Sequence, residues 1–517
     1  MIILNKWRLI FKYFLIVLLL VLITLRILVI FLNIADIAGM EQNVIYSIQQ
    51  LLYNGNLYTS PLNAPFSITQ YTPIYYLINA FTAKSLGFTE DNIYALYHIG
   101  RFWNLIFNLA SSYLIYRIGK DYFRISGSKT LILFVASFAL NFAHNFAVRP
   151  DSLHDLAGIA SIYAMIVYYQ SGKKNIANLL LTVALTAIAV FSKQSGIQFI
   201  IIFVGFTFLI KDWATMLKLI ASTVLFYGIL FYTAHLIYPS FFENIIGGVK
   251  NGIDVTNFVE YILTRSIFIL TGWPLILYFL YLLLSRNLLF KGADISKLLA
   301  ISGLGTLIFA SVTALKMGAT TQYYVVFMNL ALIVALNQSF KIKASVKGLK
   351  FFIDKYSLTS FFCLFIILIF GFNTFKSIAN FKEDPKLISQ KTSTAKIAKL
   401  ISSDFKSNND KYVYSNLGTD TYAPSRQFLN NIYFKNCLVP QRDILEYSTS
   451  KLEVVGYNEF EKLLKDGDIE YIIDSNPNSK YEIVKDFNKI KNSDYTLVLN
   501  SDGYLVYKNN KSTWKRK

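Results

Sequence analysis

Long apolar stretches alternate with short polar segments over roughly the first three quarters of the chain. A helix that crosses a membrane needs about twenty mostly apolar residues, and about eleven stretches approach that length. The predicted spans lie near 13–33, 99–117, 130–147, 153–170, 176–192, 196–210, 218–238, 267–285, 298–315, 325–340 and 358–375. The pattern therefore predicts an α-helical polytopic membrane protein with about eleven transmembrane helices.

The pattern becomes polar and charged near residue 376. Helical spacing of apolar residues recurs in KTSTAKIAKLISSDF and NEFEKLLKDG, whereas KYVYS and IEYIID alternate like strands. The run YTLVLNSDGYLVY predicts a β-hairpin, because Asp-Gly stands at its centre. We therefore divide the chain into a membrane domain, 1–375, and a small α/β domain, 376–517.

A second long segment that does not span the membrane follows the first predicted helix, at 34–98. It contains the amphipathic stretch QNVIYSIQQLLYNG and the aromatic stretch YTPIYYLINAF, which includes Pro73. Tyr-rich amphipathic helices are typical of membrane surfaces. We expect this segment to form interfacial helices in the first exterior loop.

Composition and charge agree with a membrane location. The chain is 54% hydrophobic and 16% charged, whereas soluble domains carry about 25% charged residues. The net charge of +19 could indicate a nucleic-acid partner, but Lys and Arg concentrate in alternate predicted loops, as the positive-inside rule requires. We therefore expect no nucleic-acid partner. We expect a multi-pass protein of the cell membrane, such as a bacterial plasma membrane, with a cytoplasmic amino terminus and an extracytoplasmic carboxy-terminal domain.

Several polar and ionisable residues stand at the predicted exterior ends of the spans. A charge near hydrocarbon needs a partner, so a set of such residues at one depth is a candidate site. The set comprises Asp36, Glu41, His98, Arg101, Arg149, Asp151, Asp155, Lys193, Gln194 and Lys316.

Each of these residues also has an ordinary structural explanation. Loop carboxylates usually face water, and Lys or Arg at a helix end usually extends to the surface. Asp151 could simply cap a helix. His144 and His154 could bind a metal with nearby carboxylates, but their spacing is not typical of a ligand set. We predict no metal site and no required cofactor, and leave a divalent cation open.

The mixture of carboxylates and cations fits one chemistry well. A carboxylate can act as a general base toward a hydroxyl or an amine, and cations can stabilise a departing phosphate. Both needs arise when a sugar is transferred from a polyprenyl phosphate whose tail stays in the membrane. The sequence contains neither a Walker A loop nor a dinucleotide fingerprint.

A series of short motifs resembles the integral-membrane glycosyltransferases of the type C fold. The nearest groups are family 39 and the related lipid-A and rhamnan-type transferases. The resemblance covers roughly residues 10–340 and rests on the order of the motifs. They are Glu41 with LLYNGNLY, then YTPIYYL, RFWNLIFNLASSYLIYRIGK, RPDSL, SKQSG and KMGATTQYY.

The resemblance implies roles for individual residues. The family carries its catalytic base in the first exterior loop, usually within an Asp-Glu pair. Glu41 takes the second position of that pair and Met40 the first, so either Glu41 or Asp36 would be the base. Asp151 resembles the second acidic residue of the family site.

The donor phosphate must be bound differently from many relatives, which have a Lys where this chain has Thr72. We assign the phosphate to Arg149, Lys193 and Lys316. The residues expected to contact the rest of the substrate are Tyr71, Arg101, Gln194, Gln322 and Tyr323.

The implied activity is transfer of a hexosyl or pentosyl group from a polyprenyl-phosphate donor to an extracytoplasmic acceptor. The acceptor would be a cell-surface glycan, a lipid or a protein. Two alternatives remain open. A lipid-linked glycan polymerase or ligase would usually carry its large exterior loop in mid-chain, and a transporter or flippase would place polar sites at the midplane of repeated halves. The chain shows neither feature.

Overall fold

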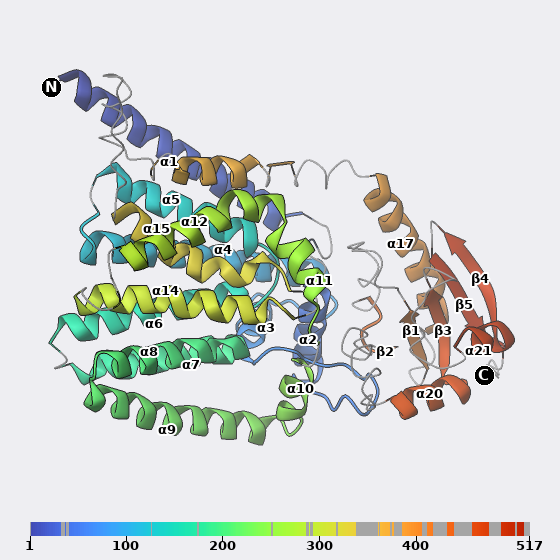
Figure 1. The fold of residues 1–517 in the computed structure, drawn as a ribbon. Helices are drawn as coiled ribbons and strands as arrows, with labels where there is room; N and C mark the ends of the chain where they lie inside the picture. The colour runs from blue at the N-terminus through green and yellow to red at the C-terminus, as the bar shows by residue number, and fades with distance from the viewer. Residues whose placement is uncertain are drawn as a thin grey trace.

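Helices dominate the described chain up to residue 376, and a small sheet follows (Figure 1). The structure is a computed structural model. It describes residues 2–32, 37, 41–125, 127–172, 175–249, 252–285, 289, 293–316, 319–337, 360, 362–372, 375–376, 385–405, 411–416, 432–438, 457–474, 487–501 and 504–510.

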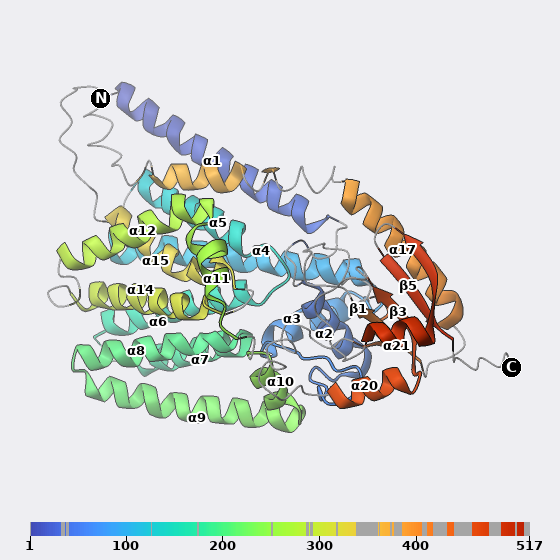
Figure 2. The same cartoon turned by 45° about the vertical axis from the view of Figure 1, so that its right-hand side comes forward.

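The long apolar helices pack side by side as a bundle (Figures 1 and 2). They are α1 (Ile2–Ile30), α4 (Ile93–Arg117), α5 (Ser128–His144), α6 (Asp151–Gln170), α7 (Ile176–Ser192), α8 (Ile197–Leu209), α9 (Trp213–Ile237), α12 (Ser266–Ser285), α14 (Asp294–Thr313) and α15 (Val325–Asn337). A shorter apolar helix follows at Phe362–Phe372. Each predicted span overlaps one of these helices.

Four described helices are long and apolar enough to cross a membrane by length and composition. They are Leu9–Ile30, Trp213–Ile237, Ser266–Ser285 and Asp294–Thr313. The other helices of the bundle are shorter or more polar. Eleven crossings therefore stay a prediction, whereas the multi-pass helical architecture is confirmed.

The surface of the bundle shows which helices face lipid. α15 is apolar on all sides and buried along almost its whole length, as expected of a central helix. α9 is also apolar, yet Leu217, Val224 and Leu225 are each more than 60% exposed. Apolar area costs roughly 25 cal/mol per Å² in water, so this face of α9 is suited to hydrocarbon.

Short elements cover one end of the bundle. They are α2 (Glu41–Asn54), α3 (Ile74–Ser85), α10 (Phe241–Gly247) and the irregular segment 55–73. Asn244 of α10 fixes that segment twice: its Oδ1 accepts from the Thr69 N–H at 2.8 Å, and its Nδ2 donates to the Thr59 carbonyl oxygen at 2.8 Å. The helices predicted within 34–98 are thus present, and they cover this end of the bundle.

The carboxy-terminal part forms a five-stranded sheet of order β2-β1-β3-β5-β4. The strands are β1 (Tyr412–Asn416), β2 (Cys437–Leu438), β3 (Ile469–Asp474), β4 (Tyr495–Ser501) and β5 (Tyr504–Asn509), with helices α17 (Pro385–Phe405), α20 (Tyr457–Lys465) and α21 (Phe487–Asp494). β1 pairs in parallel with β2 and β3, and β5 pairs antiparallel with β3 and β4. The predicted small α/β fold is confirmed. β2 was not predicted, because two residues carry no readable pattern.

The sheet lies at the end of the bundle that α2 and α3 cover (Figures 1 and 2). Phe66 of segment 55–73 packs into the apolar core of this domain, edge-to-face with Phe460 at 5.8 Å between ring centroids. Lys435 pairs with Glu90 at 3.2 Å and lies over the Tyr53 ring at 5.0 Å. The two parts of the chain therefore contact each other through residues of the 34–98 segment.

Candidate active site

The site is built where α6 begins and α7 ends. Pro150 precedes the first helical turn, and Asp151 is the first residue of α6. Lys193 follows α7 with extended backbone angles, φ −154° and ψ 133°, so its side chain leaves the helix direction. Because α6 and α7 are antiparallel neighbours, these positions meet, and Lys193 Nζ donates to Asp151 Oδ1 at 2.6 Å.

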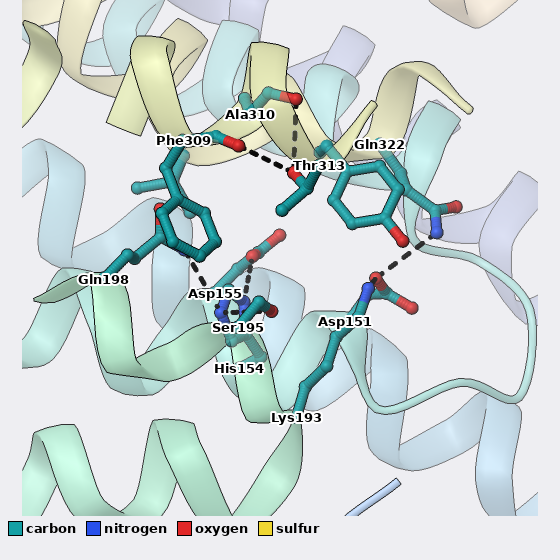
Figure 3. Close-up of a pocket in the computed structure, with 12 residues that line it drawn as sticks. Asp151, His154, Asp155, Lys193, Ser195, Gln198, Phe309, Ala310, Thr313 and Gln322 are labelled. Atoms are coloured by element: carbon teal, nitrogen blue, oxygen red, sulfur yellow. Dashed lines mark hydrogen bonds and ion pairs between the residues drawn. The ribbon is translucent and has the colours of Figure 1, made fainter. Parts of the chain in front are cut away.

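Arg149 approaches Asp151 from the other side. Its Nε lies 3.3 Å from Asp151 Oδ2, and its Nη1 donates to Gln322 Oε1 at 3.2 Å. Gln322 comes from a 3₁₀ turn, Thr321–Tyr324, before α15, and its Nε2 donates to Asp151 Oδ1 at 3.3 Å. One buried carboxylate is thus shared by two cations and an amide; Figure 3 shows Asp151 with Lys193 and Gln322.

Two tyrosines complete the surroundings of the cations. The Lys193 ammonium lies 4.3 Å from the ring centroid of Tyr323 and 5.8 Å from that of Tyr71. The Tyr71 hydroxyl accepts a long hydrogen bond from Arg149 Nη2 at 3.5 Å. Aromatic faces attract cations, so these rings hold the ammonium in place without neutralising it.

The charges in this group are strongly coupled. Burial alone would raise the pKa of Asp151, but Lys193 and Arg149 lower it to about 2. Burial alone would lower the pKa of Lys193, but the adjacent Asp151 carboxylate raises it above its usual range. Burial, and then repulsion from Lys193 and Arg149, lowers the pKa of Lys316 to about 8. A cation repelled by its neighbours gains stability when an anion arrives.

A pocket opens beside the Asp151–Lys193 pair (Figure 3). Polar side chains from α6 and the α7–α8 connection form one wall, and α14 and α15 contribute a largely apolar wall. The lining residues are Asp151, His154, Asp155, Lys193, Ser195, Gln198, Phe309, Ala310, Thr313, Gln322, Tyr323 and Val326. A pocket with a few polar groups on an apolar background suits an amphipathic ligand.

Glu41 lies behind this pocket rather than in it. Its side chain is fully buried, and Arg101 holds it with two hydrogen bonds, Nε to Oε1 at 3.1 Å and Nη2 to Oε2 at 2.8 Å. The same carboxylate accepts from the N–H groups of Ile37 at 2.8 Å and Val148 at 2.7 Å. The structure therefore joins Glu41 to Asp151 through the turn that carries Val148 and Arg149, and not through a shared cavity.

Arg101, expected to contact substrate, is instead engaged with Glu41 and with the Leu32 carbonyl oxygen, to which its Nη1 donates at 2.9 Å. The side chain is fully buried. Gly100 beside it explains the close approach of the turn to α4, since a Cβ there would lie 2.4 Å from Val148 Cγ1. Arg101 thus holds Glu41 and, through it, the Val148 turn.

The remaining predicted residues fall into three groups. The pocket is lined by Asp151, Lys193, Gln322 and Tyr323. Arg149 and Tyr71 contact the Asp151–Lys193 pair, whereas Lys316 Nζ donates to the Gly248 carbonyl oxygen at 3.3 Å and is close enough to Lys193 and Arg149 to be repelled by them. Gln194 lies outside the pocket, because its Nε2 donates to the Gln70 carbonyl oxygen at 2.6 Å. Asp36 lies outside the described residues.

Thr72, at the position where many relatives have Lys, donates from its hydroxyl to the Val190 carbonyl oxygen at 2.6 Å. Its contact is therefore with the backbone of α7. The cations of the site come from Arg149, Lys193 and Lys316, which stand elsewhere in the sequence.

The sequence analysis missed Ser195 and Gln198 as pocket residues. Their signal was their position two and five residues after Lys193 in SKQSGIQ. His144 and His154, considered together for a metal, have different partners: His144 Nδ1 lies 3.1 Å from Thr321 Oγ1, and His154 Nδ1 lies 2.8 Å from Asp155 Oδ1. Within the described residues, no three His, Cys, Asp or Glu side chains are grouped as a metal ligand set.

The fold and the motifs define a multi-pass membrane protein of the type C glycosyltransferase class. The family model described as dolichyl-phosphate-mannose-protein mannosyltransferase matches residues 70–238. This segment contains the RPD turn, Lys193 and six of the twelve residues that line the pocket. The resemblance predicted from the motifs is confirmed: residues 70–238 match this family model, and the fold is that of the type C glycosyltransferases.

Solved structures support the same fold along the whole chain. ArnT from Cupriavidus metallidurans bound to undecaprenyl phosphate matches with a TM-score of 0.59 and 13% identity, over 98% of this chain and 99% of that one. The oligosaccharyltransferase AglB from Archaeoglobus fulgidus, in complex with an inhibitory peptide and a dolichol-phosphate, matches with a TM-score of 0.54 and 11% identity, over 99% of this chain and 75% of that one. No curated protein matches the sequence.

Proposed function

We propose that this protein transfers a sugar from a polyprenyl-phosphate donor to an extracytoplasmic acceptor, which is a cell-surface glycan, a lipid or a protein. The observation that carries the proposal is a group of three cations: Arg149 and Lys193 contact the buried carboxylate of Asp151, and Lys316 lies close enough to both of these cations to be repelled by them. This excess of positive charge is suited to a phosphate.

The cations have donors to offer an incoming phosphate. An ammonium has three N–H donors and a guanidinium five, and Asp151 occupies only some of them. When the sugar leaves, negative charge grows on the phosphate oxygen, and fixed cations in a buried pocket lower that barrier. The same groups therefore serve donor binding and departure of the carrier.

The position of the pocket also fits a lipid carrier. α14 contributes Phe309, Ala310 and Thr313 to the wall. On the same helix, Ile308 and Val312 are more than half exposed. The head-group site is thus separated by a single helix from apolar surface on which a polyprenyl chain can lie. The undecaprenyl phosphate bound to ArnT and the dolichol-phosphate bound to AglB support this choice of carrier.

The resemblance implies Glu41 or Asp36 as the general base and Asp151 as the second acidic residue of the site. The burial and fourfold hydrogen bonding of Glu41 favour a supporting role for it. Asp151 lines the pocket and stays a candidate base, since a phosphate that draws Lys193 and Arg149 away would release its carboxylate.

A polymerase or ligase would use the same donor site and differ in product length. A flippase would move the carrier without breaking its bond to the sugar.

The test uses the purified full chain in vesicles with a panel of labelled undecaprenyl-phosphate sugars and an envelope extract as acceptor. We expect binding of undecaprenyl phosphate and transfer of one labelled sugar. Lys193→Gln should abolish transfer and weaken binding at least tenfold. Lys84→Gln is the matched control, because Lys84 is exposed on α3. The proposal fails if the wild-type protein does not bind undecaprenyl phosphate, or if the panel yields no transfer.

A further inference from the structure

A second polar group lines the pocket next to the cations and has no part in binding them. His154 Nδ1 lies 2.8 Å from Asp155 Oδ1, and His154 Nε2 lies 3.3 Å from Ser195 Oγ. Asp155 Oδ2 accepts from Asn145 Nδ2 at 2.7 Å. The four side chains form a continuous chain of hydrogen bonds that ends at the pocket (Figure 3 shows the three that line it).

The arrangement fixes the direction in which the imidazole faces. Asp155 is an acceptor, so Nδ1 carries the proton that it shares with Asp155, and Nε2 keeps its lone pair. That lone pair faces Ser195 Oγ and Gln198 Nε2, the latter at 3.4 Å. His154 therefore presents a proton acceptor to the pocket.

Packing holds the ring in this position. The His154 and Phe199 rings lie 5.4 Å apart between centroids. Phe199 can approach α6 this closely because residue 158 is glycine, since a Cβ there would lie 1.9 Å from Phe199 Cζ. His154 itself is only 6% exposed. A side chain locked by packing and by a carboxylate is preorganised for proton transfer.

Asp151 is a weaker proton acceptor in the same pocket. Lys193 and Arg149 stand 2.6 Å and 3.3 Å from its two oxygens, and they favour its ionised form over the protonated form that a base must reach. Among the described residues, the partners of His154 are Asp155, Ser195 and Gln198, none of which is a cation.

We propose that His154, oriented by Asp155, is the base that removes the proton from an acceptor hydroxyl group docked beside Ser195. This inference rests on the proposed function. The acceptor oxygen forms a bond to the anomeric carbon as the bond from that carbon to the phosphate oxygen breaks. The bonding pair leaves with the carrier phosphate toward Lys193 and Arg149. The hydroxyl proton moves to His154 Nε2, and Asp155 stabilises the resulting imidazolium.

The sequence spacing supports two adjoining subsites. Lys193 and Ser195 are two residues apart on the α7–α8 connection, and Asp151 and His154 are three apart on the first turn of α6. The start of α6 and the α7–α8 connection thus place the proposed phosphate-binding residues and the proposed base side by side. Ser195 is partly exposed and marks the position that the acceptor hydroxyl would take.

The test measures kcat, KM and undecaprenyl phosphate binding for His154→Gln and Asp155→Asn. The control is His235→Gln, because His235 is exposed on α9. A general base typically contributes a factor of about 10²–10⁴. We expect kcat to fall about 100-fold or more in His154→Gln and less in Asp155→Asn, with binding of undecaprenyl phosphate unchanged. In His154→Ala, added imidazole should restore part of the turnover, whereas it should not do so in Lys193→Gln.

The outcomes separate this inference from the proposed function. If His154→Gln binds undecaprenyl phosphate and turns over at the wild-type rate, His154 is not the base, and the transferase proposal stands. If His154→Gln loses carrier binding as well and imidazole has no effect on His154→Ala, the residue is structural and the inference is overturned. If the wild-type protein transfers no sugar, both proposals fail together.

Discussion

The Nζ atom of Lys193 lies 2.6 Å from Oδ1 of Asp151, across the contact between α7 and α6. Both side chains are more than nine-tenths buried. Such a pair does not stabilise a fold by much in itself, because desolvation offsets the attraction, but loss of one partner leaves an unpaired buried charge. The pair therefore keeps the Lys193 cation charged and fixed within an apolar bundle.

Asp151→Asn should destabilise the protein and abolish transfer. The buried charges of Lys193 and Arg149 would lose their carboxylate, at a cost of about 3–5 kcal/mol. Thermal unfolding in detergent should show a clear loss of stability. A large part of that stability should return when undecaprenyl phosphate is added, because the phosphate replaces the missing anion. The control is Asp121→Asn, in the exposed pair with Arg117 at 2.6 Å, which should change stability by less than about 1 kcal/mol. A loss that the carrier does not reverse would argue against a shared site for the carboxylate and the phosphate.

Glu41→Gln should act mainly on stability. Arg101 would lose its charged partner in a fully buried environment, and the Val148 turn would lose an anchor. We expect a loss of about 3–5 kcal/mol. The double variant Glu41→Gln, Arg101→Gln should unfold at a higher temperature than the sum of the single effects predicts, since no uncompensated charge remains. Strict additivity in this cycle would show that the pair is not coupled. A stable Glu41→Gln protein without activity would return Glu41 to the role of base.

The sequence predicted the helices and most strands because their signals are local. Apolar runs of helical length located α1, α4 to α9, α12, α14 and α15, and Asp-Gly located the β4–β5 hairpin. The cations Arg149 and Lys193 were predicted because charges at span ends need partners. The environment of Glu41 could not be predicted, since its partners Arg101 and Val148 lie 60 and 107 residues away. A motif shows that a carboxylate is required, and only packing shows whether it faces a cavity.

Lys316 should make carrier binding depend on pH. Its pKa is lowered to about 8 by burial and by repulsion from Lys193 and Arg149, so the side chain loses its positive charge as pH rises through 8. The folded state then binds fewer protons than the unfolded state between about pH 8 and 10.5, the ordinary pKa of a lysine side chain. This contribution therefore makes the folded protein more stable as pH rises through that window. Affinity for undecaprenyl phosphate should fall between pH 7 and 9, and Lys316→Arg should flatten the fall because guanidinium stays charged. If affinity falls with pH equally in the wild-type protein and in Lys316→Arg, Lys316 is not the source of the pH dependence.

Phe66→Ala should loosen the contact between the carboxy-terminal domain and the bundle. Phe66 has a positive φ of 60°, a strained conformation for a bulky residue, and its 4% exposed ring lies in the domain core with Phe460 and Tyr414. Packing thus compensates for backbone strain. Removal of the ring should lower the free energy of unfolding by about 3–5 kcal/mol. Phe66→Gly should lower it less than Phe66→Ala does, because glycine accepts this φ.

Hydrogen exchange would measure that change. Amides of β1 and β3 should exchange faster in Phe66→Ala, and transfer should slow because segment 55–73 leads directly to Tyr71 beside Lys193. Leu62→Ala is the matched control, since Leu62 lies in the same segment and is 45% exposed. Unchanged exchange in β1 and β3 together with slower transfer would mean that Phe66 acts on the pocket without the domain. Unchanged transfer with faster exchange would mean that the domain contact does not position Tyr71.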